Sequence, residues 1–216
     1  MRRGQRNRAE IFYLRIMITI SKSKNKTYLT LESLREMSDE EFQKFSAREA
    51  PYQFEREPDG TIVMMEPTVS YSGYFNSTLS GELYSWNRKM KLGYLFDSST
   101  GFKLPDGSVR SPDASFVLKE RWETLTEKEK NSYSPLCPDF VVELASPSDD
   151  LEELREKMKM YMTNGCRLGW LIDPENKKIF IYRTPYSFDT VEGFDKKISG
   201  EDVLPQFELD LSILKK

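Results

Sequence analysis

Histidine is absent from the 216 residues of this chain. The absence excludes Ser-His-Asp and Cys-His catalysis, histidine-ligated zinc and any imidazole base. Two cysteines, Cys137 and Cys166, are too few for a cysteine-rich zinc site or a disulfide framework, and they favour a reducing, cytoplasmic location. Any catalysis must therefore depend on carboxylates, amines or hydroxyls.

Long apolar runs and a strong excess of one charge are also lacking. No stretch of about 18 apolar residues occurs, which excludes a transmembrane helix, and we expect no membrane partner. The 32 Lys and Arg residues nearly balance the 35 Asp and Glu residues, so the chain is not globally basic. A nucleic-acid partner would have to be met by local basic patches or with the help of a divalent cation.

The composition is that of a globular protein, with 38% hydrophobic and 31% charged residues. A chain of this length is sufficient for one domain with a substantial core. The first residues are rich in arginine and are followed by Lys, Ser and Asn. We expect residues 1–26 to be a disordered or artefactual extension, and residues 27–216 to form a single domain.

Local patterns in the N-terminal half predict helices and short strands. The signals are helix caps, turn residues between strand-like runs, and apolar residues at spacings of three and four. The predicted elements are a helix from Thr30, a helix capped by Ser38 and Glu41, a hairpin around residues 58–60, a helix over residues 75–90 ended by Gly93, strands at 94–97, 102–104 and 111–118, and an exposed helix over 119–130.

The C-terminal half predicts a βαβ-like unit. A strand over residues 140–145 is followed by a helix over Asp149–Asn164 and a strand over 168–172, and a turn at 173–176 then leads into a hairpin. The fold class expected for the whole chain is α/β, with a mixed β-sheet flanked by helices.

Glu143 is a carboxylate inside an apolar strand. Period-two alternation places Phe140, Val142 and Leu144 on one face and puts Glu143 on the other, with Val141 and Ala145. In a strand covered on both faces, a carboxylate is costly unless it is paired or bound to a cation. Glu143 is therefore the first candidate for chemistry. The alternative is an edge strand on which Glu143 is simply solvated.

Asp113 follows Pro112 and opens a second apolar run. A Pro-Asp pair alone is a common turn. If the two runs form neighbouring strands, however, Asp113 and Glu143 bring carboxylate oxygens together, and oxygen ligands with water are what Mg²⁺ requires. The pair therefore predicts a site for Mg²⁺ or Mn²⁺.

A lysine on the following helix could reach that site. Lys157 falls about 40° outside the edge of the helix's apolar stripe, where a lysine stem can run along the core towards a buried acid. Lys159 and Arg155 flank the opposite edge, so spacing alone does not choose among the three. All three can equally be surface cations.

At this point the chain resembles the Uma-two family of restriction-endonuclease-like proteins, within the PD-(D/E)XK nuclease superfamily. The resemblance covers roughly residues 27–216, and it is the combination of short motifs that is specific. The motifs are Phe54-Glu-Arg56 before Asp59-Gly60, Glu66-Pro-Thr68, Asn76, Trp86-Asn-Arg88, Pro112-Asp113, Val141-Val-Glu-Leu-Ala-Ser-Pro-Ser148, Lys157 with Tyr161 and Gly165, Leu168-Gly-Trp-Leu-Ile-Asp-Pro174 and Ser199-Gly-Glu-Asp-Val-Leu-Pro205.

The resemblance implies roles for single residues. Asp113 and Glu143 match the metal-binding acids, and Lys157 matches a lysine that this family takes from the helix. In most of the superfamily the lysine stands two residues beyond the glutamate, a position that Ala145 occupies here. Glu55 matches a supporting acid before the first hairpin. The chain also departs from relatives with a histidine on the early helix, since no histidine is present.

Residues and resemblance together predict a Mg²⁺-dependent DNA endonuclease. Asp113, Glu143 and the backbone carbonyl of Leu144 would hold the ion, and Lys157 would position water and stabilise negative charge. Glu55 is a supporting catalytic acid. Two alternatives stay open: a non-catalytic relative that binds nucleic acid or protein, and a metal-dependent hydrolase of another phosphate ester.

Substrate contacts are less sharply indicated. Candidate DNA-binding residues are Arg88, Lys89 and Lys91, or Lys22, Lys24 and Lys26, with Tyr71 and Tyr74 nearby. Solvated helix faces explain these charges equally well. A homodimer is compatible with cutting both strands, but no pattern in the chain requires it.

Overall fold

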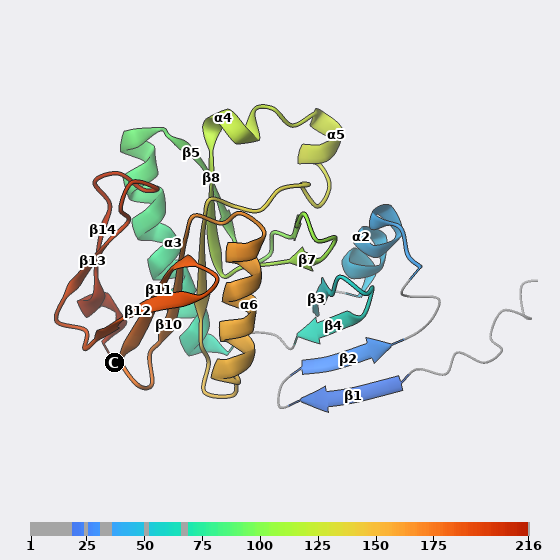
Figure 1. Cartoon of the computed structure of the whole chain (residues 1–216), viewed down its shortest axis with the longest axis horizontal. Coiled ribbons are helices and arrows are strands. Elements are labelled where there is room, and N and C mark those ends of the chain that lie inside the picture. Colours follow the sequence, from blue (N-terminus) through green and yellow to red (C-terminus); the bar gives the residue numbers. More distant parts are fainter. Residues whose placement is uncertain (1–18, 24–25, 31–35, 50–51, 66–68, 216) are drawn as a thin grey trace, which may run out of the picture.

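Two six-stranded sheets form the framework of the molecule (Figure 1). The computed structural model describes residues 19–23, 26–30, 36–49, 52–65 and 69–215. We call the sheet with strand order β12-β11-β10-β9-β8-β5 the C-terminal sheet and the sheet with order β1-β2-β4-β3-β7-β6 the N-terminal sheet. The predicted α/β class, with a mixed sheet flanked by helices, is confirmed.

The C-terminal sheet carries the larger core. Its strands β9 and β10 are parallel and the other neighbouring pairs are antiparallel. The strands are β5 (Gly93–Asp97), β8 (Ala114–Leu118), β9 (Phe140–Leu144), β10 (Leu168–Asp173), β11 (Lys178–Thr184) and β12 (Ser187–Glu192). The parallel pair β9–β10, joined by a helix, confirms the predicted βαβ unit.

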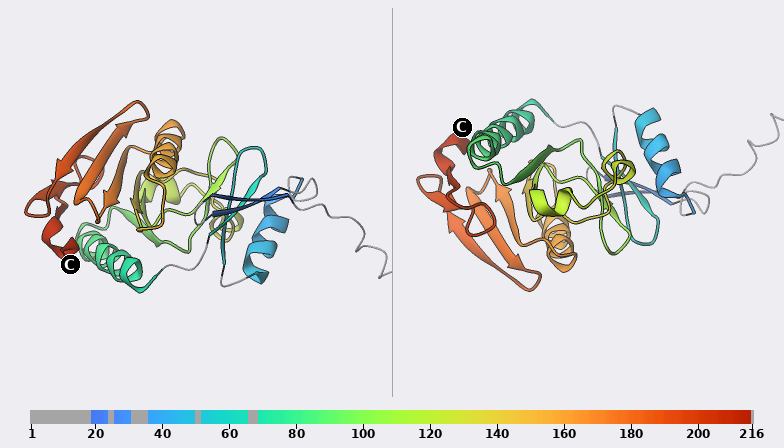
Figure 2. Two further views of the ribbon diagram at one scale, coloured as in Figure 1. Left: turned by 90° about the horizontal axis from the view of Figure 1, so that it is seen from below. Right: turned by 90° about the horizontal axis from the view of Figure 1, so that it is seen from above.

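Two helices cover opposite faces of this sheet (Figure 2). Helix α3 (Ser70–Met90) packs Phe75, Leu79 and Leu83 against one face. Helix α6 (Leu151–Thr163) packs Leu154, Met158 and Met162 against the other. Because both faces are covered, the central strands are buried on both sides, as the apolar runs predict.

Helix α6 has identifiable boundaries. The Asp150 side chain caps its start by accepting a hydrogen bond from the Glu152 amide, and Gly165 follows its end with a φ of +99°, a conformation that suits glycine. Helix α3 ends at Met90, with Lys91 in the left-handed conformation at a φ of 56°. The predicted end at Gly93 is wrong, because Gly93 already belongs to β5.

The N-terminal sheet is built from shorter strands and carries helix α2 (Asp39–Arg48). Its strands are β1 (Thr19–Ser23), β2 (Lys26–Thr30), β3 (Gln53–Arg56), β4 (Ile62–Met65), β6 (Phe102–Lys103) and β7 (Val109–Arg110). The predicted hairpin is the β3–β4 pair, and the predicted capping box of Ser38 and Glu41 starts α2. Both predictions are confirmed.

Smaller elements complete the described chain. They are α4 (Lys119–Trp122), α5 (Glu127–Lys130), β13 (Lys197–Ser199), β14 (Glu208–Asp210) and η2 (Leu211–Leu214). The single helix expected over residues 119–130 is therefore two short helices, because Thr126 forms a capping box of its own with Glu129.

The N-terminal boundary also needs correction. Strand β1 lies within residues 1–26, which were expected to precede the domain, and it pairs with β2 in antiparallel register. Thr30, the expected start of a helix, ends β2, and residues 31–35 and 1–18 lie outside the described residues. No described helix combines the length and apolar character that a membrane crossing requires.

A close approach of β5 and β8 gives a test of this arrangement. A Cβ atom on Gly93 would lie 2.1 Å from the Val117 carbonyl oxygen, whereas one on Gly81, on α3, would meet nothing within 4 Å. We expect Gly93→Ala to lower the free energy of unfolding by about 1–3 kcal/mol. Gly81→Ala should raise it by about 0.5–1 kcal/mol, because alanine favours the helix. Denaturant unfolding measures both changes. An unchanged free energy of unfolding in Gly93→Ala would contradict the close approach of Gly93 to the Val117 carbonyl.

Candidate active site

Strand pairing brings Asp113 and Glu143 together. Ala114 pairs with Val142 in the antiparallel β8–β9 register, so the next step places Asp113 across from Glu143. The Leu144 amide donates a 2.7 Å hydrogen bond to Asp113 Oδ2. Asp113, Glu143 and the Leu144 backbone therefore meet at one end of the strand pair.

Glu143 is buried among apolar residues. Its strand lies between β8 and β10, and the Glu143 residue is only 4% exposed. Val141, on the same face, packs with residues of α6, whereas Phe140 and Val142 pack with residues of α3. The alternation predicted from the sequence is confirmed, and the alternative of a solvated edge strand is wrong.

Lys157 is the cation that reaches the strand acids. Its Nζ lies 2.8 Å from Glu143 Oε1 and 2.8 Å from Glu55 Oε1. Lys159 instead pairs with Glu156, and Arg155 pairs with Glu152, so both have their partners on α6 itself. The choice that helical spacing left open is thus made by the tertiary structure.

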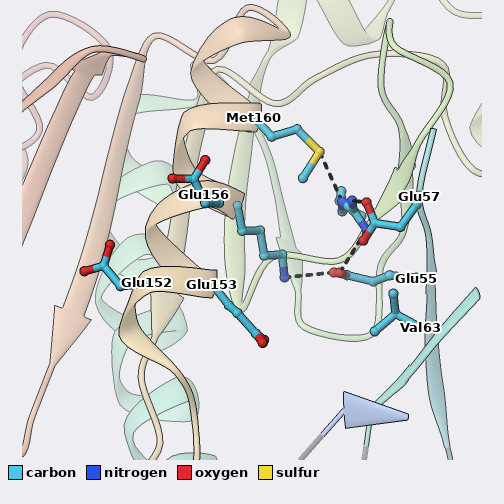
Figure 3. Close-up of a pocket in the computed structure, with 9 residues that line it drawn as sticks. Glu55, Glu57, Val63, Glu152, Glu153, Glu156 and Met160 are labelled. Carbon is cyan, nitrogen blue, oxygen red and sulfur yellow. Dashed lines mark hydrogen bonds and ion pairs between the residues drawn. The ribbon is translucent and has the colours of Figure 1, made fainter. Parts of the chain in front are cut away.

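Glu55 comes to the site from the N-terminal sheet. Its Oε1 also accepts a 2.9 Å hydrogen bond from the Ser111 amide, and its Oε2 lies 3.5 Å from Arg110 Nη1. Arg110 is 2% exposed and also pairs with Glu57. Figure 3 shows Glu55 and Glu57 facing helix α6 across a pocket. Glu55 is therefore held by two cations and a backbone amide.

Two further residues hold the candidate metal acids in place. The Tyr161 hydroxyl donates a 2.9 Å hydrogen bond to Glu143 Oε1, and Asn76 Nδ2 donates a 2.8 Å hydrogen bond to Asp113 Oδ1. Tyr161 stands in the motif that resembles the Uma-two family, but sequence reasoning gave it no role and did not name Arg110. The available signal was a hydroxyl on a buried helix face, one turn after Lys157.

The electrostatics of the site follow from burial and one central cation. Burial raises the pKa of Glu143 to about 7, although Lys157 acts in the opposite direction. Burial also raises the pKa of Asp113. For Glu55, burial is outweighed by Lys157 and Arg110, so its pKa is lowered. The pKa of Lys157 is raised, because Glu143 and Glu55 outweigh the burial of its ammonium group.

The oxygen atoms around Asp113 are of the chemical type that a hard divalent cation prefers as ligands. Carboxylates and backbone or amide carbonyls are the ligands that Mg²⁺ and Mn²⁺ prefer. No group of three or more Asp, Glu, His or Cys side chains within the described ranges has the geometry of a metal site. Glu55 and Glu143 both contact Lys157, but only Glu143 lies across from Asp113, so these two acids with backbone or amide oxygens could hold a cation.

A pocket of about 360 Å³ lies between α6 and the N-terminal sheet (Figure 3). Its lining residues are Glu55, Glu57, Val63, Arg110, Glu152, Glu153, Glu156, Lys157 and Met160. The pocket is rich in carboxylates and reaches the site from the side of Glu55 and Lys157. A phosphate approaching from this side would meet several negative charges.

The predicted substrate-binding cations are not brought to the acids. Arg88 and Lys89 are in the last turn of α3, twelve or more residues beyond Asn76, which corresponds to about 18 Å along a helix. Lys91 follows them and lies next to the end of the β5–β8 pair at which Gly93 pairs with Leu118. Asp113 lies at the opposite end of this pair. The side chains of Lys22, Lys24 and Lys26 lie outside the described residues.

Comparison with known proteins agrees with this fold. The family model Uma2, described as "putative restriction endonuclease", matches residues 39–212. A crystal structure of a putative nuclease belonging to DUF820 from Anabaena variabilis ATCC 29413 is similar with a TM-score of 0.68 and 19% identity, covering 82% of this chain and 97% of that one. Among curated proteins there is no match.

A stability test separates Lys157 from its neighbour on the same helix. Lys157→Met leaves Glu55 and Glu143 buried without their ammonium partner, and we expect a loss of about 3 kcal/mol of unfolding free energy. Lys159→Met removes only a surface pair, and its effect should stay below about 0.5 kcal/mol. Denaturant unfolding at neutral pH measures the difference. Equal losses in the two variants would refute the buried contact.

A second test uses the pH dependence of stability without divalent cations. The pKa of Glu143 is raised to about 7 in the folded protein, whereas an unfolded glutamate has a pKa of about 4.3. The contribution of Glu143 to the free energy of unfolding is therefore fully present below the pKa of the unfolded state. It is lost as the pH rises through the pKa of the folded state. We expect Glu143→Gln, which cannot ionise, to gain stability relative to the parent across this interval, by up to about 4 kcal/mol. Parallel stability curves for the two proteins would contradict the raised pKa.

Proposed function

Because this chain belongs to the Uma2 family, whose description is putative restriction endonuclease, we propose that it is an endonuclease that hydrolyses phosphodiester bonds of DNA with Mg²⁺ or Mn²⁺. The fold is that of a putative nuclease. The metal, the DNA substrate and the cleavage reaction go beyond the family description and the fold, and they are our proposal. A cytoplasmic location and a homodimer stay predictions.

One observation carries the proposal. Two acids, the half-buried Asp113 next to β8 and the buried Glu143 on β9, meet at the same end of these antiparallel strands. Among the described ion pairs, the only cation that contacts either of them is Lys157. This one ammonium group is shared between Glu143 and Glu55, so no cation of the described ion pairs balances the charge of Asp113. A divalent cation bound there would balance it.

The cation, when bound, would polarise the phosphoryl group and supply an activated water. Asp113 and Glu143 are the residues that would hold it, with the backbone carbonyl of Leu144. The hydrogen bonds from the Leu144 amide and Asn76 fix the Asp113 carboxylate, and the Tyr161 hydroxyl fixes that of Glu143.

Lys157 has a separate task. Its pKa is raised by Glu143 and Glu55, so it remains an ammonium group at neutral pH. A group that keeps its proton does not serve as a general base. Its role is to orient water and to stabilise the negative charge that develops on the phosphoryl oxygens. Glu55 holds the ammonium group in position for this task.

Plasmid nicking in the presence and absence of Mg²⁺ tests the proposal. The parent protein should cut with Mg²⁺ and stop when the metal is chelated. Asp113→Asn and Glu143→Gln should each lower the rate by at least about 100-fold. The matched control is Asp189→Asn, an exposed aspartate on β12 that pairs with Arg183, which should leave the rate unchanged.

Two outcomes would overturn the assignment. A protein with both acids replaced that still cuts like the parent would place the chemistry elsewhere. A folded parent that binds DNA without cutting it in Mg²⁺ or Mn²⁺ would be a non-catalytic relative of the same fold. An inactive variant that is purified in parallel by the same procedure controls for a contaminating nuclease.

A further inference from the structure

Asn76 contacts the candidate metal acid Asp113 through one end of its side-chain amide. Nδ2 donates a 2.8 Å hydrogen bond to Asp113 Oδ1. An ionised carboxylate only accepts hydrogen bonds, so the amino end of the amide must be the end that faces it. The orientation of the whole amide is thereby set, and the position of its oxygen follows.

The other end of this amide has no partner. Asn76 Oδ1 is buried and accepts no hydrogen bond from the described residues. Buried polar atoms are nearly always satisfied, so such an atom calls for an explanation. Five other buried side-chain atoms share this condition: Ser46 Oγ, Ser115 Oγ, Arg155 Nε, Trp170 Nε1 and Tyr182 OH. None of these belongs to a residue with a described hydrogen bond to Asp113, Glu143 or Glu55.

Covalent geometry keeps the unpaired oxygen close to the carboxylate. Oδ1 and Nδ2 are bonded to the same carbon, so Oδ1 is within about 5 Å of the Asp113 oxygen that Nδ2 contacts. Metal–oxygen distances are about 2.1 Å for Mg²⁺. A cation on Asp113 is therefore within reach of the amide oxygen, directly or through one water.

We propose that Asn76 is a further residue of the divalent-cation site, with its side-chain oxygen as a neutral oxygen donor beside the carboxylates of Asp113 and Glu143. This inference rests on the proposed function. The two ends of the amide then serve different purposes. Nδ2 fixes the orientation of Asp113, and Oδ1 completes the oxygen set that the cation meets. The amide adds no negative charge to a region where the carboxylates of Asp113 and Glu143 already lie across from each other on neighbouring strands.

Mn²⁺ binding to the full chain, followed by the electron paramagnetic resonance signal of the free ion, tests the inference without any assay of cleavage. Asn76→Ala removes both ends of the amide, and we expect Mn²⁺ affinity to fall about tenfold or more. Asn76→Asp removes the donor to Asp113 but keeps an oxygen in the same place, and it should bind Mn²⁺ at least as tightly as the parent.

A charge control accompanies these variants. Ser77→Asp adds the same negative charge at the neighbouring exposed position of α3. Its Mn²⁺ affinity should differ from that of the parent by less than about threefold, since surface charges are screened. Thermal unfolding without metal verifies that each variant is folded, and Asn76→Ser replaces Asn76→Ala if the latter is not.

The outcomes separate the inference from the proposed function. If Asn76→Ala binds like the parent, or if Asn76→Asp is weakened as much as Asn76→Ala, the oxygen has no part in binding and the inference is wrong. If Asn76→Asp binds Mn²⁺ more tightly than the parent and Ser77→Asp gains the same affinity, the effect is one of charge alone and the inference is equally wrong. If the parent itself binds no Mn²⁺ at millimolar concentration, the proposed function fails.

Discussion

A single ammonium group placed between two buried carboxylates is the contact on which the site depends. Lys157 Nζ lies 2.8 Å from Glu143 on the C-terminal sheet and 2.8 Å from Glu55 on the N-terminal sheet. Each of these charges would be costly alone in the interior, because burial removes its water. The contact therefore connects the two sheets and the helix between them through one point.

The surrounding polar contacts divide the site into two sides. On one side, Arg110 and the Ser111 amide join Lys157 in stabilising Glu55, whose pKa is lowered. On the other side, Asp113 and Glu143 receive hydrogen bonds from neutral groups and have raised pKa values because of burial. The negative charge that is not balanced by the protein thus lies at the β8–β9 end, where oxygen donors converge. The pocket on the Glu55 side is lined by several carboxylates, which would repel a phosphate approaching from that side.

Much of the local structure was predictable, because its causes are local. The Ser38–Glu41 capping box, the β3–β4 hairpin and the α6 boundaries each depend on residues a few positions apart. Predictions failed where a contact distant in sequence decides the outcome. Strand β1 exists as a partner of β2, and Gly93 belongs to β5 because it pairs with Leu118 on β8.

For the site, the sequence by itself determined which face Glu143 occupies, since strand alternation follows from backbone geometry alone. It also determined that the chemistry cannot use an imidazole. The tertiary structure alone decided that Lys157 and not Lys159 reaches the acids, and that Glu55 arrives from another sheet. These outcomes depend on how sheets and helices are placed against one another, and residue spacing along one element contains no information about that placement.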